Sequence, residues 1–146
     1  MTSFYGTAEL GKKNIVLGVL LFAVMGFLMG IPLTVDFFGG SMLTTEQYVV
    51  WKVVHGYGVF LSFINFFYGF VIDRVNLTRQ QKKVSSWCFV LAGVVGGFGR
   101  MCLALLGALD QFGVWASLGE VALFVVGTAV FIYGQLRTDK PASAAA

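Results

Sequence analysis

The sequence predicts an all-α membrane protein, a polytopic bundle of four transmembrane helices, and three observations predict it. Hydrophobic residues make up 58% of the 146 residues, whereas charged residues make up only 12%, about half the share found in soluble domains. The mean hydropathy is +0.83. The apolar residues also gather in four runs, each close to the length that a helix needs to cross ~30 Å of hydrocarbon. The protein is therefore expected to have membrane lipid as its surroundings.

The four runs place the expected spans at about 14–33, 49–73, 84–109 and 112–136, in one transmembrane domain covering 1–146. The first run carries no charge, and Pro32 lies near its expected end. It leads into aromatic and acidic residues instead of a small-residue cleavage site, so we expect a retained helix and not a signal peptide. The tail 138–146 is small and polar, which predicts disorder.

Basic residues set the expected orientation. They gather before the first span, between the second and third spans, and after the fourth: Lys12, Lys13, Arg74, Arg79, Lys82, Lys83, Arg137 and Lys140. The other two loops contain Asp36, Glu46 and Asp110 and no basic residue. The positive-inside rule then predicts that the N- and C-termini are both cytoplasmic. The net charge of +3 indicates no nucleic-acid partner, because the basic residues flank apolar runs and form no polar face.

Ionisable residues inside the spans are the candidates for a functional site. They are Lys52, His55, Arg100 and Glu120. Lys52 lies near a helix end and can extend to the headgroups. The other three lie roughly 10 to 14 Å below the outer end of their own helices, at ~1.5 Å per residue. Because an isolated intramembrane charge is costly, we expect Arg100 and Glu120 to pair, and both are candidate catalytic residues.

His55, the one histidine of the chain, lies on a helix face of small and polar residues. This face holds Gly58, Ser62, Asn65 and Gly69, and the third span has a comparable surface of Ala92, Gly93, Gly96, Gly97 and Gly99 next to Arg100. Such stripes serve close helix packing, and a buried imidazole is commonly satisfied by a neighbouring hydrogen bond. They would equally suit haem b, with His55 as metal ligand, a shelf of Gly58, Ser62 and Gly96, and Arg100 pairing with a propionate. The absence of CxxCH excludes covalent c-type attachment.

The order of these features resembles the styrene oxide isomerases, small bacterial membrane proteins with four spans. The resemblance is carried by the glycine-rich first span, by 51–58 around His55, by the basic turn, and by 87–100. It implies that His55 is the axial ligand of haem b, held between neighbouring subunits of a homotrimer in the bacterial inner membrane. It also implies an isomerase whose ferric iron acts as a Lewis acid on an epoxide, which rearranges to an aldehyde or ketone.

The chain departs from that family at three polar positions. Leu61 stands where the family has asparagine, Ala92 where it has aspartate, and Arg100 where it has tyrosine. The resemblance therefore implies a retained haem ligand and an altered substrate pocket. Two other functions remain open: a cofactor-free accessory subunit of a larger membrane complex, and a small transporter that uses Glu120 as a proton-coupled carboxylate.

Overall fold

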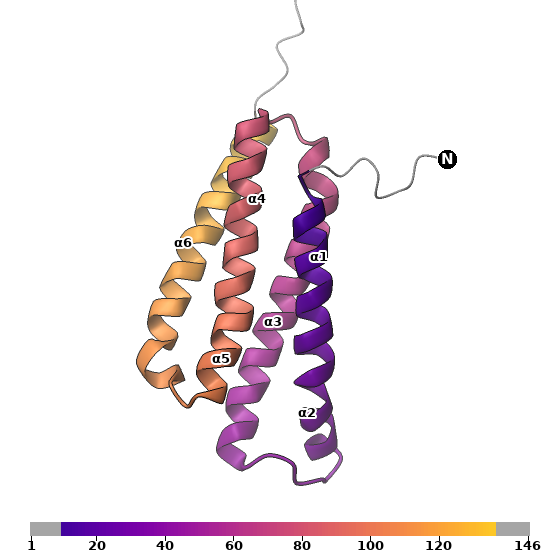
Figure 1. Cartoon of the computed structure of the whole chain (residues 1–146), viewed down its shortest axis with the longest axis vertical. Coiled ribbons are helices and arrows are strands. Elements are labelled where there is room, and N and C mark those ends of the chain that lie inside the picture. Colours follow the sequence, from indigo (N-terminus) through magenta and orange to yellow (C-terminus); the bar gives the residue numbers. More distant parts are fainter. Residues whose placement is uncertain (1–9, 137–146) are drawn as a thin grey trace, which may run out of the picture.

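The computed structural model describes residues 10–136, and every regular element within that range is helical (Figure 1). The first helical segment comprises α1 (Lys12–Leu21), the π-helical η1 (Phe22–Leu28) and α2 (Gly30–Phe37). The second comprises α3 (Thr45–Val71) and the 3₁₀ turn η2 (Ile72–Arg74). The third comprises α4 (Arg79–Gly93), the π-helical η3 (Val94–Gly99) and α5 (Arg100–Leu105), and the fourth is α6 (Leu109–Leu136). All four segments are long and apolar enough to span a membrane, which confirms the predicted four-helix architecture.

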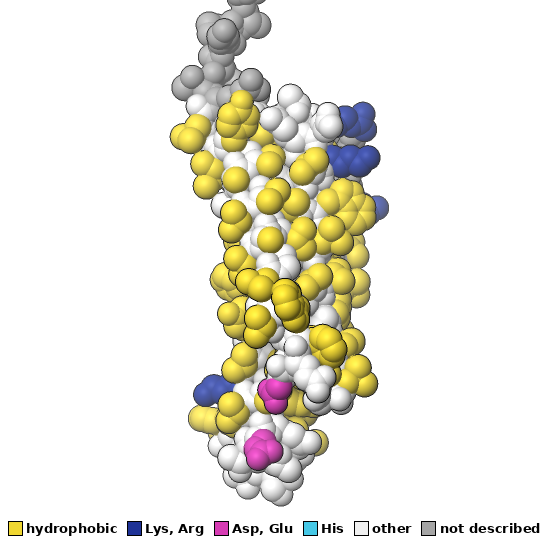
Figure 2. Space-filling view, turned by 90° about the vertical axis from the view of Figure 1, so that its left-hand side faces the viewer, with side chains coloured by type: hydrophobic (Ala, Val, Ile, Leu, Met, Phe, Trp, Pro, Cys, Tyr) yellow, Lys and Arg dark blue, Asp and Glu magenta, His cyan; other side chains and the backbone are white. Residues whose placement is uncertain are grey.

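The four segments form a bundle in which α1 packs mainly on α3 and α4 packs mainly on α6 (Figure 1). The α1–α3 contact is close because glycines form it: a Cβ added at Gly18 would lie 2.7 Å from the backbone nitrogen of Phe66. Both ends of the described chain lie at one end of the bundle. Figure 2 shows a largely hydrophobic surface, with most of the visible Lys and Arg near that end and the acidic side chains near the other.

The helices extend beyond the predicted spans because their first turns are polar. Thr44 caps α3 and Thr78 caps α4, each through a capping box with the glutamine three residues later. The second and third helices therefore begin at Thr45 and Arg79, before the predicted 49 and 84. The third helix also ends at Leu105 and the fourth begins at Leu109, before the predicted 109 and 112. The predicted tail 138–146, Arg137 and Lys140 lie outside the described residues.

Pro32 does not end the first helix, which continues to Phe37. A proline inside an α-helix removes one hydrogen bond and clashes with the carbonyl four residues earlier. Here the preceding turns are π-helical, and the Met29 N–H donates to the Val24 carbonyl at 3.2 Å instead of to Met25. The π segment changes the register ahead of Pro32 and leaves the Met25 carbonyl available to another donor.

A buried polar network joins the helices at the end that carries the described termini. Asn14, which is fully buried, donates to the Asn65 Oδ1 and to the Ser86 carbonyl, both at 3.2 Å, and accepts from the Ser86 hydroxyl. Tyr68 donates to the Ser85 hydroxyl, and Ser85 donates to the Gly127 carbonyl at 2.8 Å. Side chains that hydrogen-bond between helices stabilise bundles in lipid, so this network fixes how α1, α3, α4 and α6 meet.

Candidate functional site

Arg100 and Glu120 form a buried ion pair between the third and fourth helical segments. The Arg100 Nη2 lies 2.7 Å from the Glu120 Oε2, and the two residues are 7% and 6% exposed. The Arg100 Nη2 also donates to the Ser117 hydroxyl at 2.9 Å, and that hydroxyl donates to the Gly113 carbonyl at 2.7 Å. The structure thus confirms the pairing that the cost of a lone intramembrane charge predicts.

The neighbours of this pair explain why it fits inside the bundle. Arg100 follows directly after η3, and its guanidinium lies 4.1 Å from the centre of the Tyr57 ring on α3, a cation–π distance. Gly96 in η3 gives room to the carboxylate, since a Cβ there would lie 2.5 Å from the Glu120 Cδ. Within the described residues, the ion pair is the one polar contact of the buried Glu120 Oε2. The negative charge of the Glu120 carboxylate is therefore stabilised by Arg100.

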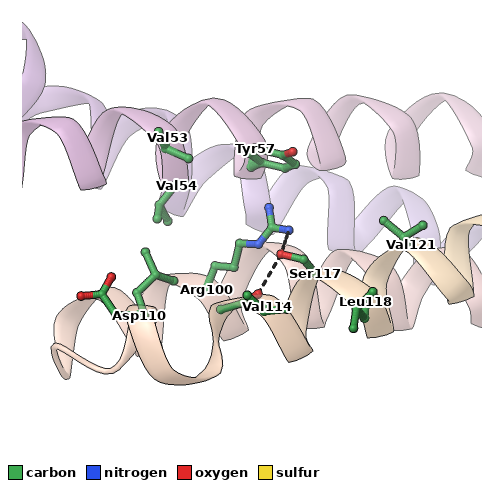
Figure 3. A pocket seen from close by; sticks show the side chains of 11 residues that line it. Val53, Val54, Tyr57, Arg100, Asp110, Val114, Ser117, Leu118 and Val121 are labelled. Atoms are coloured by element: carbon green, nitrogen blue, oxygen red, sulfur yellow. Dashed lines mark hydrogen bonds between the residues drawn. The ribbon is translucent and has the colours of Figure 1, made fainter.

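A cavity of about 570 Å³ lies beside the pair, between α3 and the first half of α6 (Figure 3). Its walls are largely valine and leucine, and Figure 3 shows the Arg100 guanidinium between Tyr57 and Ser117. Val53, Val114 and Leu118 at its rim are 51%, 65% and 57% exposed. These residues lie within candidate membrane spans, so we expect the cavity to open toward the hydrocarbon.

His55 lies at a second place, against η1. Its Nδ1 is 2.6 Å from the Met25 carbonyl oxygen, and a Cβ at Gly30 would come within 3.2 Å of its Cε1. A carbonyl oxygen can only accept, so Nδ1 carries the proton, and in the neutral imidazole Nε2 then carries the lone pair. His55 is half-buried, and its Nε2 has no hydrogen-bond partner among residues 10–136.

The candidate residues thus divide between two sides of α3. Successive residues of an α-helix turn by ~100°, so Tyr57, which stacks on Arg100, points about 200° away from His55. Gly58 and Ser62 lie on the side that faces the first segment: a Cβ at Gly58 would lie 2.3 Å from the Met25 Cγ, and the buried Ser62 hydroxyl donates to the Val59 carbonyl at 2.8 Å. Gly58, Ser62 and Gly96, the residues that the sequence suggested as a shelf for haem, are all packed against other side chains of the same chain.

Two residues of the Arg100 site were not predicted from the sequence. Tyr57 gives no sequence signal, because aromatic residues are frequent throughout α3. Ser117 precedes Glu120 by three residues, a spacing that places both side chains on one helix face and that could have identified it. The described residues contain no group of three or more His, Cys, Asp or Glu side chains that could hold a metal ion.

Comparison with known protein families, with curated proteins and with solved structures gives no match for this chain.

Proposed function

We propose that this chain is an integral membrane protein that binds haem b through the His55 Nε2. The observation that carries the proposal is the 2.6 Å contact between the His55 Nδ1 and the Met25 carbonyl. Histidine ligands of metals almost always donate their other ring N–H to a carbonyl or carboxylate, which fixes the tautomer and orients the ring. The residues at His55 therefore fit an axial haem ligand.

The surrounding chain prepares His55 for this role. The π-helical η1 diverts the Met29 N–H to Val24, so the Met25 carbonyl can hold the imidazole. Gly30 leaves space beside the ring, because any side chain at that position would press on the Cε1. The chain has no second histidine, so bis-histidine ligation within one chain is impossible and we expect the opposite axial position to be open.

A second copy of the chain would complete the haem-binding pocket. His55 is half-buried at the edge of the packed face of α3, and Gly58 and Ser62 beside it are already covered by the first helix. The ring would therefore lie on the outside of one bundle, at a boundary between protomers. This position agrees with the homotrimer that the resemblance to styrene oxide isomerases implies.

The reaction proposed from that resemblance is epoxide isomerisation, for which haem iron supplies Lewis-acid chemistry when it is bound. Leu61 and Ala92 are apolar, and Arg100 is held by Glu120 and Ser117. None of them supplies the polar group that the family has at its position. We therefore propose an apolar substrate pocket that differs from the family's pocket.

We also propose that the basic end of the bundle faces the cytoplasm of a bacterial inner membrane. Lys12, Arg74 and Arg79 lie at the end where the described chain begins and ends, and the positive-inside rule places that end in the cytoplasm. Single cysteines at Arg79 and at Met42, in a background without native cysteines, should be labelled from opposite sides. Labelling of both from one side, or of Met42 from the cytoplasm, would refute this orientation.

An absorption spectrum tests the haem proposal. Wild-type protein purified with haem available should show a Soret band of a five-coordinate or water-ligated haem, and His55→Ala should lose it. Added imidazole should restore part of the band, and Gly56→Ala should keep it, because a Cβ at Gly56 meets nothing within 4 Å. The absence of a Soret band in the wild type, or an unchanged band in His55→Ala, would refute the proposal.

A cofactor-free accessory subunit is the second candidate, and the surface of α6 favours it. Over its 28 residues α6 buries only Glu120, Gly127 and Gly134, so most of its apolar surface is open to a partner. Under this alternative the bond between His55 and Met25 would be structural, and purification in mild detergent should retain a larger complex without haem.

A further inference from the structure

The cavity between α3 and α6 is independent of His55 and has the features of a ligand site. Its volume of about 570 Å³ lies within the range of small-molecule sites, which are mostly apolar with a few placed polar groups. Here the apolar walls come from residues such as Val53, Val114 and Leu118, and the polar side chains of the lining are Arg100, Ser117, Tyr57 and Asp110.

Arg100 retains hydrogen-bond donors for a ligand. Its Nη2 is engaged by Glu120 and Ser117, whereas the Nη1 and Nε have no acceptor among residues 10–136. A guanidinium has five N–H donors and no acceptor, so three N–H groups remain unused. The side chain that carries them is more than nine-tenths buried and lines the cavity.

The charge at this end of the cavity selects a neutral ligand. The positive charge of Arg100 is balanced by Glu120 at 2.7 Å, and Asp110 adds a carboxylate to the lining, so an anion would meet no net positive charge. The unused N–H groups are donors only, so they can hydrogen-bond an acceptor atom of a ligand. The ligand should therefore carry a neutral acceptor oxygen, and it should be lipid-soluble because the cavity opens within the spans.

We propose that this cavity binds a neutral, lipid-soluble carbonyl compound of the quinone class, whose carbonyl oxygen accepts from the free N–H groups of Arg100. The flat apolar body lies between the valine and leucine walls of α3 and α6. The ester carbonyl of a phospholipid offers the same acceptor chemistry and is the alternative source of the oxygen.

The test is equilibrium dialysis of 2,3-dimethyl-1,4-naphthoquinone against nanodiscs with and without the protein. Protein-containing nanodiscs should bind the quinone saturably beyond its partition into lipid. The matched hydrocarbon 2,3-dimethylnaphthalene, which lacks both carbonyls, should bind at least about tenfold more weakly, the range expected for a hydrogen bond to a charged group. Equal binding of the two compounds, or no saturable binding, would overturn the proposal.

Matched variants locate the site. Val114→Phe fills the rim of the cavity and should weaken binding about tenfold or more, whereas Val125→Phe, on the same helix but outside the cavity, should leave it unchanged. Arg100→Lys keeps a positive charge for Glu120 but removes the forked donors, so it should weaken the quinone and not the hydrocarbon. Quinone binding that Val114→Phe does not change would place the ligand elsewhere and refute the proposal.

Two further experiments distinguish the two sources of the carbonyl oxygen and separate this cavity from the His55 site. Nanodiscs of diether lipids lack ester carbonyls: tighter quinone binding there identifies the lipid ester as the competing occupant, and unchanged binding assigns the site to the free carbonyl compound. Either result supports a carbonyl site. His55→Ala should bind the quinone as the wild type does, so a failure of the haem proposal leaves this one intact. Loss of quinone binding in a folded His55→Ala protein would refute an independent site.

Discussion

Removing Arg100 should destabilise the protein more than removing Glu120, and removing both should cost less than removing Arg100 alone. The Glu120 Oε2 is buried, and the ion pair is its one polar contact within residues 10–136. Breaking a buried pair from one side costs about 3–5 kcal/mol, because an uncompensated charge remains. Arg100→Met should therefore reach that range.

Removing Glu120 leaves Arg100 with other partners for its guanidinium. After Glu120→Leu, the guanidinium keeps its bond to the Ser117 hydroxyl at 2.9 Å and its contact with the Tyr57 ring, and its free N–H groups face the cavity. Its cost should stay near the lower end of the same range, about 3 kcal/mol or less. In the double variant no charge remains, and apolar replacement of a buried pair is often close to neutral. The magnitude of the coupling energy is therefore expected to be at least about 3 kcal/mol, the loss from Arg100→Met alone.

The assay is reversible unfolding in mixed micelles of dodecyl maltoside and increasing SDS, followed by circular dichroism. The four proteins of the cycle give the coupling free energy directly. Arg100→Met combined with Val125→Ala supplies the control cycle, since Val125 is exposed and outside the site, and those two losses should add. Additive losses in the Arg100–Glu120 cycle as well would refute the argument that the carboxylate depends on Arg100.

Two other perturbations test the packing of the bundle by the same unfolding assay. Gly58→Ala should cost about 1–3 kcal/mol through overpacking, because its Cβ would lie 2.3 Å from the Met25 Cγ, whereas Gly56→Ala meets nothing within 4 Å and should be neutral or stabilising; equal effects would contradict the close approach. Asn14→Ala removes its bonds to Asn65 and Ser86 and should cost about 1–2 kcal/mol at ~0.6 kcal/mol per bond, and an unchanged midpoint would show that the network contributes nothing.

The four helices and the ion pair could be predicted because both follow from the energetics of lipid. Hydropathy, however, identifies only the part of a helix that lies in the hydrocarbon. It therefore missed the polar first turns of the helices, which begin at Thr45 and Arg79. The capping signals were present in the sequence, as Thr44 with Gln47 and Thr78 with Gln81. Reading them would have placed both helix starts correctly.

The environment of His55 could not be predicted, because its partner is a backbone carbonyl that a π segment makes available. No residue type marks such a segment, and Pro32 alone suggested a helix end. The rise per residue placed His55, Arg100 and Glu120 at a similar depth in the membrane. Depth alone, however, does not determine which face of a helix contacts which neighbouring helix. The structure joins Arg100 to Glu120 and turns His55 toward Met25.

The Asp73 carboxylate has a consequence for how the chain is made. It accepts from the Leu10 N–H at 3.3 Å and the Gly11 N–H at 3.1 Å, and α1 has no side-chain cap of its own at Gly11. A ribosome delivers this acceptor 62 residues after Gly11, once both helices of the first hairpin have been synthesised. The N–H groups of Leu10 and Gly11 thus gain this acceptor only after the second helix has been inserted and its end has returned to the same side of the membrane. The first two spans therefore reach their final form in the membrane as a pair.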